Sequence, residues 1–270
     1  MVKKHSSDSR HYKSPHRSFR RTYREDYIRE LNVPGMGQHI YESFWWFVKE
    51  HRVFLPLFML VSLSEILVVN LTYETTMVFT ILIFLLIWLT VIFVLRQRMA
   101  KHQVGLRDAL YNSMTPLVSS LVVFITIVIQ CVPIFLLLMA YSAAIQTEFL
   151  NMPFYAFLFL GFAGLMITIS SYLLSSSLIA LVAVSAPGIY PWKALMTAAE
   201  LMIGRRIRFL LRIVALIMML GLLWMIILLP LSVLKLPSEV LAVIVAILSC
   251  FSMIYTTIYL YLYYRYLLDA

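Results

Sequence analysis

Six long apolar runs dominate the pattern of hydrophobic and polar positions along this chain of 270 residues. Nearly every run holds about 20 residues or more, the length that an α-helix needs to cross a hydrocarbon core of ~30 Å. The pattern therefore predicts an all-α fold, a polytopic membrane protein with a six-helix transmembrane bundle formed by residues 37–270. The predicted spans lie at about residues 53–71, 76–95, 117–142, 153–183, 209–230 and 239–263.

Short amphipathic segments precede the odd-numbered spans and predict helices at the cytoplasmic surface. Around Leu195, apolar residues recur at helical spacing, whereas Lys193 and Glu200 occupy the opposite face. Aligning the polar faces matches Leu195 with Leu110, 85 residues earlier, and Leu110 with Ile40, a further 70 residues earlier. This alignment predicts a threefold repeat of a short helix followed by a helical hairpin. The identities are few, and a helix that leads into a span tends to be amphipathic in any case, so both interpretations stay open.

The composition supports the membrane assignment. Hydrophobic residues make up 62% of the chain, well above the roughly 45–50% typical of soluble domains. The first apolar run begins only at Val53, so we expect it to act as an uncleaved insertion signal rather than as a cleavable signal peptide.

Basic residues gather on one side of the predicted spans. Of the 22 Lys and Arg residues, 21 lie in segments that would share one aqueous side, and Lys235 alone lies on the other. Because basic residues next to spans favour the cytoplasmic side, this asymmetry predicts a multi-pass cell-membrane protein with cytoplasmic N- and C-termini.

Residues 1–36 are polar and basic and predict a disordered cytoplasmic tail, because they have too few apolar side chains to offset the entropy of ordering. The tail is interpreted either as a solvated topogenic arm or as a contact to anionic lipid. We expect no specific nucleic-acid binding, because no folded DNA- or RNA-reading motif accompanies the charge.

A group of basic residues around the start of the fifth span predicts contact with membrane lipids. Long cationic side chains at a span end reach the aqueous interface while their stems remain in apolar surroundings. We expect this group to contact anionic headgroups at the cytoplasmic face. It comprises Lys193, Arg205, Arg206, Arg208 and Arg212.

Few polar side chains lie inside the predicted spans. Glu65 in span one is interpreted either as a functional site or as a structural residue that reaches the interface. Span four carries small residues at intervals of three and four, which indicate close packing of a neighbouring helix, with Ser249, Ser252 and Thr256 of span six as a candidate partner. The alternative is a polar cavity shared by spans three, four and six. Its candidate lining is Gln130, Thr168, Ser171 and Ser175.

Tyrosines are frequent in the second half of span six, between Tyr255 and Tyr266. Aromatic side chains with a polar tip are enriched at the boundary between hydrocarbon and water. We interpret this series as an anchoring belt at the cytoplasmic interface.

Catalytic signatures are missing from the sequence. It contains no serine nucleophile elbow, no His-Glu-x-x-His pair and no Walker loop. Cys131 and Cys250 lie inside apolar runs and have neither disulfide nor metal-site spacing. We therefore expect no enzyme activity, no cofactor and no metal. The favoured function is a non-catalytic membrane module whose cytoplasmic helices contact lipid, a protein partner or a second copy. The alternative is a transporter or permease subunit with a polar path between spans three, four and six.

The region around span five carries a family resemblance in Pro191-Trp192-Lys193-Ala194-Leu195, Ala199-Glu200-Leu201, Gly204-Arg205 and the apolar run after Phe209. It resembles the six-span membrane domain associated with bacterial glycerophosphodiester phosphodiesterases and related uncharacterised membrane proteins. The catalytic barrel of those enzymes and its His-Arg-Gly motif are missing here. The resemblance therefore implies a membrane part without hydrolase activity and transfers no site residue.

Overall fold

The computed structural model describes residues 34–68, 73–146, 153–186, 188–233 and 237–269, and almost all of these residues are helical. Across these residues there is no β-strand, so the predicted all-α fold is confirmed. The helices are α2 (Met36–Lys49), α3 (His51–Val68), α4 (Tyr73–Met99), α5 (Leu106–Ser113), α6 (Leu117–Gln146), α7 (Pro153–Ala183), α8 (Pro191–Leu201), α9 (Arg206–Val233) and α10 (Ser238–Asp269).

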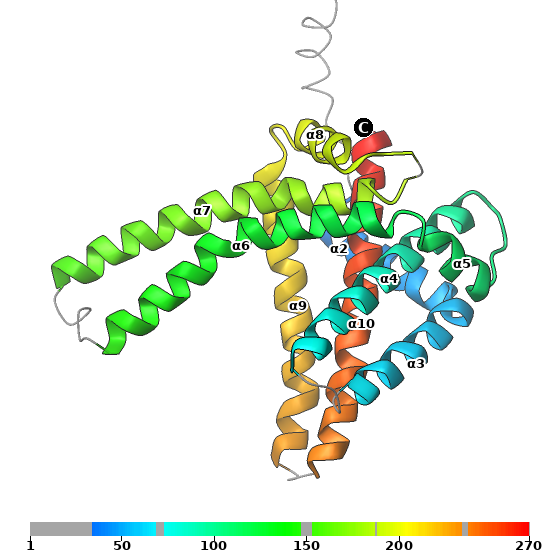
Figure 1. Ribbon diagram of the computed structural model, residues 1–270, viewed down its shortest axis with the longest axis horizontal. Coiled ribbons are helices and arrows are strands. Elements are labelled where there is room, and N and C mark those ends of the chain that lie inside the picture. The colour runs from blue at the N-terminus through cyan, green and yellow to red at the C-terminus, as the bar shows by residue number, and fades with distance from the viewer. Residues whose placement is uncertain (1–33, 69–72, 147–152, 187, 234–236, 270) are drawn as a thin grey trace, which may run out of the picture.

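The helices follow one another as three units of a short helix and a hairpin. The short helices α2, α5 and α8 lead into the hairpins α3–α4, α6–α7 and α9–α10 (Figure 1). Gly204 makes the turn from α8 into α9 with a φ of 72°, a conformation that strains any residue with a side chain. The α6–α7 hairpin extends to one side, whereas α9 and α10 run together in another direction (Figure 1).

Among the described residues, five helical segments are long and apolar enough to cross a membrane, which confirms a multi-pass membrane protein at this level. The helix α3 contains most of the predicted first span but is not one of the five, and residues 69–71 of that span lie outside the described residues. Of the predicted tail of residues 1–36, residues 1–33 also lie outside the described residues. Its last residue, Met36, is the first residue of α2. The five segments are Val78–Met99, Leu117–Gln146, Phe154–Ala183, Arg206–Leu231 and Val240–Leu268.

The hydrophobic core lies where the three units meet, at the end of the molecule that carries most of the described basic residues. The most apolar stretch of α4 is 50% buried inside the protein, and that of α10 is 39% buried. The corresponding stretches of α7 and α9 are each only 6% buried. The largest fully buried side chains include Phe54 at the start of α3, Phe209 at the start of α9 and Tyr259 in α10. Long parts of α6, α7 and α9 therefore present apolar side chains outward.

The three short helices share one register. In each, the fourth and the eighth residue are buried: His39 and Ser43 in α2, Ala109 and Ser113 in α5, Ala194 and Ala198 in α8. In each, the backbone N–H of the fourth residue donates to the carbonyl just before the helix, over 2.9–3.0 Å. These positions are separated by 70 and 85 residues, as in the sequence alignment. The structure therefore supports the threefold repeat.

Polar contacts at the same end hold the first unit together and join it to the second. Glu50, between α2 and α3, forms an ion pair with Arg98 near the end of α4, with 3.0 Å between Nε and the carboxylate. The hydroxyls of Thr90 in α4 and Ser113 in α5 lie 2.9 Å apart and are both buried. Buried polar groups that are paired in this way fix the arrangement of the helices around them.

Candidate functional site

The small-residue stripe of α7 does not form one interface within this chain. A side chain added at Gly161 or Gly164 would meet no described atom within 4 Å. Thr168 is exposed, and its hydroxyl donates to the Gly164 carbonyl of its own helix over 2.7 Å. Ser175, by contrast, is buried and donates to the Tyr172 carbonyl over 2.8 Å. The predicted close packing of a helix from the same chain is therefore wrong for the outer half of the stripe.

The residues of the predicted polar path between spans three, four and six have different surroundings in the structure, and the path itself stays a prediction. Gln130 in α6 and Ser171 in α7 are half-buried, and the buried Oε1 of Gln130 has no partner among the described residues. Ser252 of α10, proposed as a partner of the stripe, instead accepts a hydrogen bond of 2.9 Å from Trp224 Nε1 on α9. Glu65 belongs to α3, but its side chain lies outside the described residues.

The predicted headgroup residues divide into two groups. Lys193 on α8 and Arg208 on α9 are exposed, as headgroup contact requires, and Arg205 is half-buried. Arg206 lies with its guanidinium 3.7 Å from the centre of the Tyr172 ring, and its Nη1 donates to the Tyr172 carbonyl over 3.1 Å. A cation stacked on an aromatic ring in this way ties the start of α9 to α7.

Arg212 has a different place from the one predicted for it. Its side chain is half-buried, its Nη2 donates to the Pro34 carbonyl over 3.0 Å, and its guanidinium lies 5.5 Å from the ring centre of Tyr263. It therefore joins the segment before α2 to α9 and α10, rather than lying at the surface as a headgroup contact.

Beside Arg212 lies a cluster that the sequence did not reveal, formed by the buried side chains of His39, Tyr259 and Tyr263 and the half-buried side chain of Tyr266. His39 is fully buried, with its ring centre 4.1 Å from that of Tyr259 and 5.5 Å from that of Tyr266. Among the described residues, neither ring nitrogen of His39 nor the Tyr259 hydroxyl has a hydrogen-bond partner. Burial, and secondarily the positive charge of Arg212, lowers the pKa of His39 to about 3. His39 is therefore neutral at physiological pH.

The tyrosines of α10 belong to this core. Tyr255, Tyr259, Tyr261 and Tyr263 are all buried, so their interpretation as a belt at the membrane interface is wrong. The Tyr255 hydroxyl donates to the Ile40 carbonyl over 2.9 Å, and the Tyr266 hydroxyl donates to the Glu42 carboxylate. The spacing of four residues between Tyr255, Tyr259 and Tyr263 was the available signal, because it places all three on one helix face.

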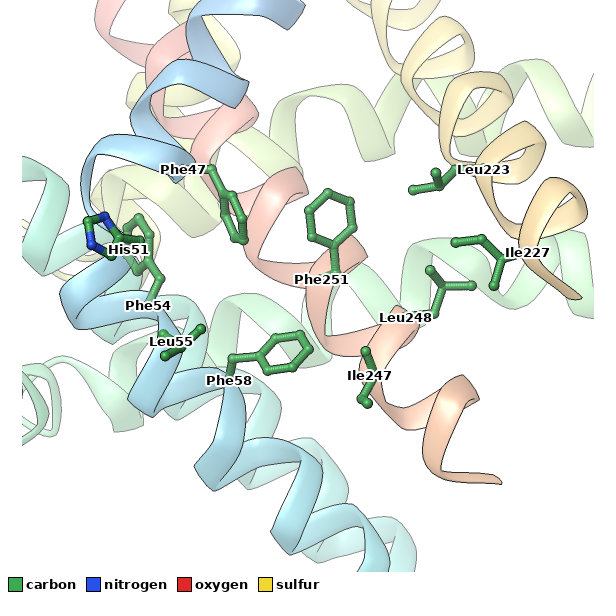
Figure 2. Close-up of a pocket in the computed structure, with 10 residues that line it drawn as sticks. All are labelled: Phe47, His51, Phe54, Leu55, Phe58, Leu223, Ile227, Ile247, Leu248 and Phe251. Carbon is green, nitrogen blue, oxygen red and sulfur yellow. The ribbon is translucent and has the colours of Figure 1, made fainter. Parts of the chain in front are cut away.

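An apolar groove lies between α2–α3 on one side and α9 on the other, with α10 behind it. It comprises two neighbouring cavities of about 370 and 570 Å³, both lined by Leu223 and Phe251. Figure 2 shows the smaller cavity, with Phe47, Phe54 and Phe58 facing Leu223 and Ile227 across Phe251. Among the described residues that line this smaller cavity, His51 alone is ionisable, and it is exposed.

A polar pocket of about 360 Å³ lies between the end of α4, the start of α6 and the segment that leads to α8. Arg96 supplies its positive charge and is held by a 3.2 Å hydrogen bond to the Ser185 carbonyl and by the Phe93 ring. Its other polar lining includes Asn112, Ser113, Thr115 and Ser119. No acid, histidine or cysteine is among the described residues that line it, so it offers no general acid–base pair.

The described residues also contain no group of three or more His, Cys, Asp or Glu side chains placed to hold a metal ion. Comparison of the chain with family models, with curated proteins and with solved structures finds no match. The resemblance to the phosphodiesterase-associated membrane domain therefore stays a prediction.

Proposed function

We propose that this chain is a non-catalytic membrane module with six spans and cytoplasmic termini. In this proposal its basic end contacts anionic lipid headgroups, and its apolar hairpins pack against other membrane helices. The observation that carries the proposal is the position of the core, which gathers at the basic end while α6, α7 and α9 present apolar surface outward.

Two further observations support this function. The exposed face of α7 around Gly161, Gly164 and Thr168 has the small side chains that allow another helix to approach closely in a bilayer. Lys193 and Arg208 are exposed at the basic end, where anionic headgroups would lie. A second copy of the chain is the simplest partner for the α7 face, because the same surface is then available on both molecules.

Cysteine cross-linking tests the packing of α7 against a second copy. In a chain with Cys131→Ala and Cys250→Ala, we expect Gly164→Cys to form an intermolecular disulfide when native membranes are oxidised, detected as a dimer on a non-reducing gel. Phe162→Cys is the matched control, because it is exposed nearby on the other side of α7. Equal cross-linking at both positions, or at neither, would contradict the proposed interface. Hydrolysis of a lipid phosphodiester by the purified protein would contradict the non-catalytic assignment.

Labelling with a membrane-impermeant thiol reagent tests the topology. In the same cysteine-free background we expect His102→Cys to be labelled only from the cytoplasmic side and Gln146→Cys only from the outside, because α6 would separate them. Both positions are exposed in the structure. Labelling of both from one side would rule out the six-span arrangement with cytoplasmic termini.

A further inference from the structure

The polar pocket between α4, α6 and the segment before α8 contains a fixed positive charge. Among the described residues that line it, Arg96 alone is charged, and its side chain is half-buried. A guanidinium has five N–H groups. The Ser185 carbonyl accepts from Nη1, and Arg96 forms no other hydrogen bond with the described residues. Most of its donors are therefore available to a ligand in the pocket.

Neutral donors from the segment that joins α5 to α6 line the same space. The hydroxyls of Thr115 and Ser119 form no hydrogen bond with a described residue. Asn112 donates one of its two amide N–H groups to the Asp108 carbonyl over 2.8 Å, which leaves the other available. Two hydroxyls and an amide can therefore donate, together with Arg96, to a ligand that has several acceptor oxygens.

Two helices begin beside the pocket. The helix α6 starts at Leu117, two residues after Thr115, and α8 starts at Pro191, directly after Tyr190 of the lining. N–H groups in the first turn of a helix lack partners within the helix and give that end a partial positive charge. The backbone N–H of Ser119 accordingly has no backbone acceptor among the described residues. Both helix ends favour an anion in the pocket.

The negative ends of α4 and α7 also lie near the pocket, but their carbonyl groups are already hydrogen-bonded. The N–H groups of residues 184–186 donate to three carbonyls at the end of α7 over 2.9–3.2 Å, and those of residues 100–102 donate to three at the end of α4 over 3.0–3.1 Å. Asp108, four residues before Asn112, is exposed and does not belong to the lining. The described lining therefore offers an anion donors and positive charge without a carboxylate to repel it.

We propose that this pocket binds a phosphate group, carried either by a lipid headgroup or by free phosphate. A phosphate presents several acceptor oxygens in different directions, which suits donors that converge from α4, from the α5–α6 segment and from the start of α8. The volume of about 360 Å³ lies at the lower end of the range for small-ligand sites. The proposal names a site and a ligand class beyond the proposed function, and only its lipid source rests on the proposed contact with headgroups.

Binding to the full-length protein in detergent tests the proposal with two phosphate-bearing probes. Phosphatidic acid is compared with diacylglycerol, which has the same chains and no phosphate, by native mass spectrometry. Inorganic phosphate is compared with chloride at equal ionic strength, by thermal unfolding. We expect saturable binding of one molecule per chain for phosphatidic acid, for inorganic phosphate or for both, and no such binding of diacylglycerol or chloride. The probe that binds identifies the source.

Substitutions locate the binding in the pocket. We expect Arg96→Gln to weaken the binding by about tenfold or more, because it removes the charged donor. Arg107→Gln removes the same charge from an exposed position on α5 outside the pocket and is the matched control. Thr115→Val combined with Ser119→Ala should also weaken binding by about tenfold. These hydroxyls form no hydrogen bond with a described residue, so this pair decides the test if Arg96→Gln does not fold.

Equal binding of the phosphate-free counterparts, an affinity unchanged by the Thr115 and Ser119 pair, or an equal loss in Arg107→Gln and Arg96→Gln would each overturn the proposal. If neither phosphate-bearing probe binds while thiol labelling still gives the expected topology, the pocket proposal fails and the proposed function stands.

Discussion

Acidification from pH 6.5 to pH 4.5 is expected to lower the free energy of unfolding of the detergent-solubilised protein by about 2 kcal/mol through His39 alone, because the loss per pH unit rises to ~1.4 kcal/mol only once the unfolded histidine is fully protonated. The folded-state pKa of His39 is about 3, whereas an unfolded histidine has a pKa near 6.5. Between these values the unfolded chain takes up a proton at this position that the folded chain does not. The free energy of unfolding is therefore unaffected by His39 about one pH unit or more above 6.5, and it falls progressively as the pH drops from there toward 3.

The replacement His39→Phe isolates this effect. Phenylalanine keeps a ring next to Tyr259 and removes both buried nitrogens that lack a partner among the described residues. Removing such groups is close to neutral or stabilising at pH 7.5. We expect thermal unfolding of the variant to depend less on pH than that of the wild type, with the two curves diverging below pH 6.5. If the unfolding temperatures of the variant and the wild type change with pH in parallel, the pKa of His39 is not lowered in the folded protein.

Five of the predicted spans and the register of the short helices follow from local patterns, and sequence reasoning therefore identified them. Hydrophobic run length is a property of consecutive residues. The spacing that aligned Ile40, Leu110 and Leu195 reflects helical periodicity, and the buried faces of α2, α5 and α8 agree with it. The helix α3 was the weakest of these assignments because Arg52, Pro56 and Glu65 interrupt its apolar character.

The buried cluster depends instead on which helices meet in space. His39 and Tyr259 are 220 positions apart in the chain, and no local pattern connects them. The repeat does hold a signal. Where α2 has His39, the other units have Ala109 and Ala194, and where α9 has Arg212, the corresponding positions hold Leu57 and Ile127. Two polar departures from the repeat thus come together in the fold.

The apolar groove and the outward face of α7 were beyond sequence reasoning for a different reason. In the sequence, a leucine that lines a groove, such as Leu223, cannot be distinguished from a leucine that faces lipid. The stripe from Gly161 to Ser175 was identified as a helix-packing surface, but periodicity does not show whether a partner comes from the same chain. Only the arrangement of the hairpins shows that Gly161 and Gly164 face outward.

Phenylalanine occupies the same position in all three units, and its replacement by alanine is expected to have unequal effects. Phe54, Phe124 and Phe209 each lie fifteen residues after the buried fourth residue of a short helix. Phe54 and Phe209 are almost fully buried, and the Phe209 ring centre lies 5.0 Å from that of Tyr263. Phe124 also packs against the core, but it is only partly buried. Phe→Ala in a well-packed core costs about 3–5 kcal/mol, partly because the cavity does not collapse.

We therefore expect Phe54→Ala and Phe209→Ala each to lower the free energy of unfolding by about 3–5 kcal/mol, and Phe124→Ala to lower it by clearly less. Thermal unfolding of the three variants in one detergent measures the difference, and Ile207→Ala, at a 75% exposed position beside Phe209, is the control. Equal losses at all three phenylalanines would mean that α6 packs onto the core as tightly as α3 and α9 do. In that case the α6–α7 hairpin would not extend outward from the core as described. The proposed contact with a second copy depends on this extension and would then be contradicted.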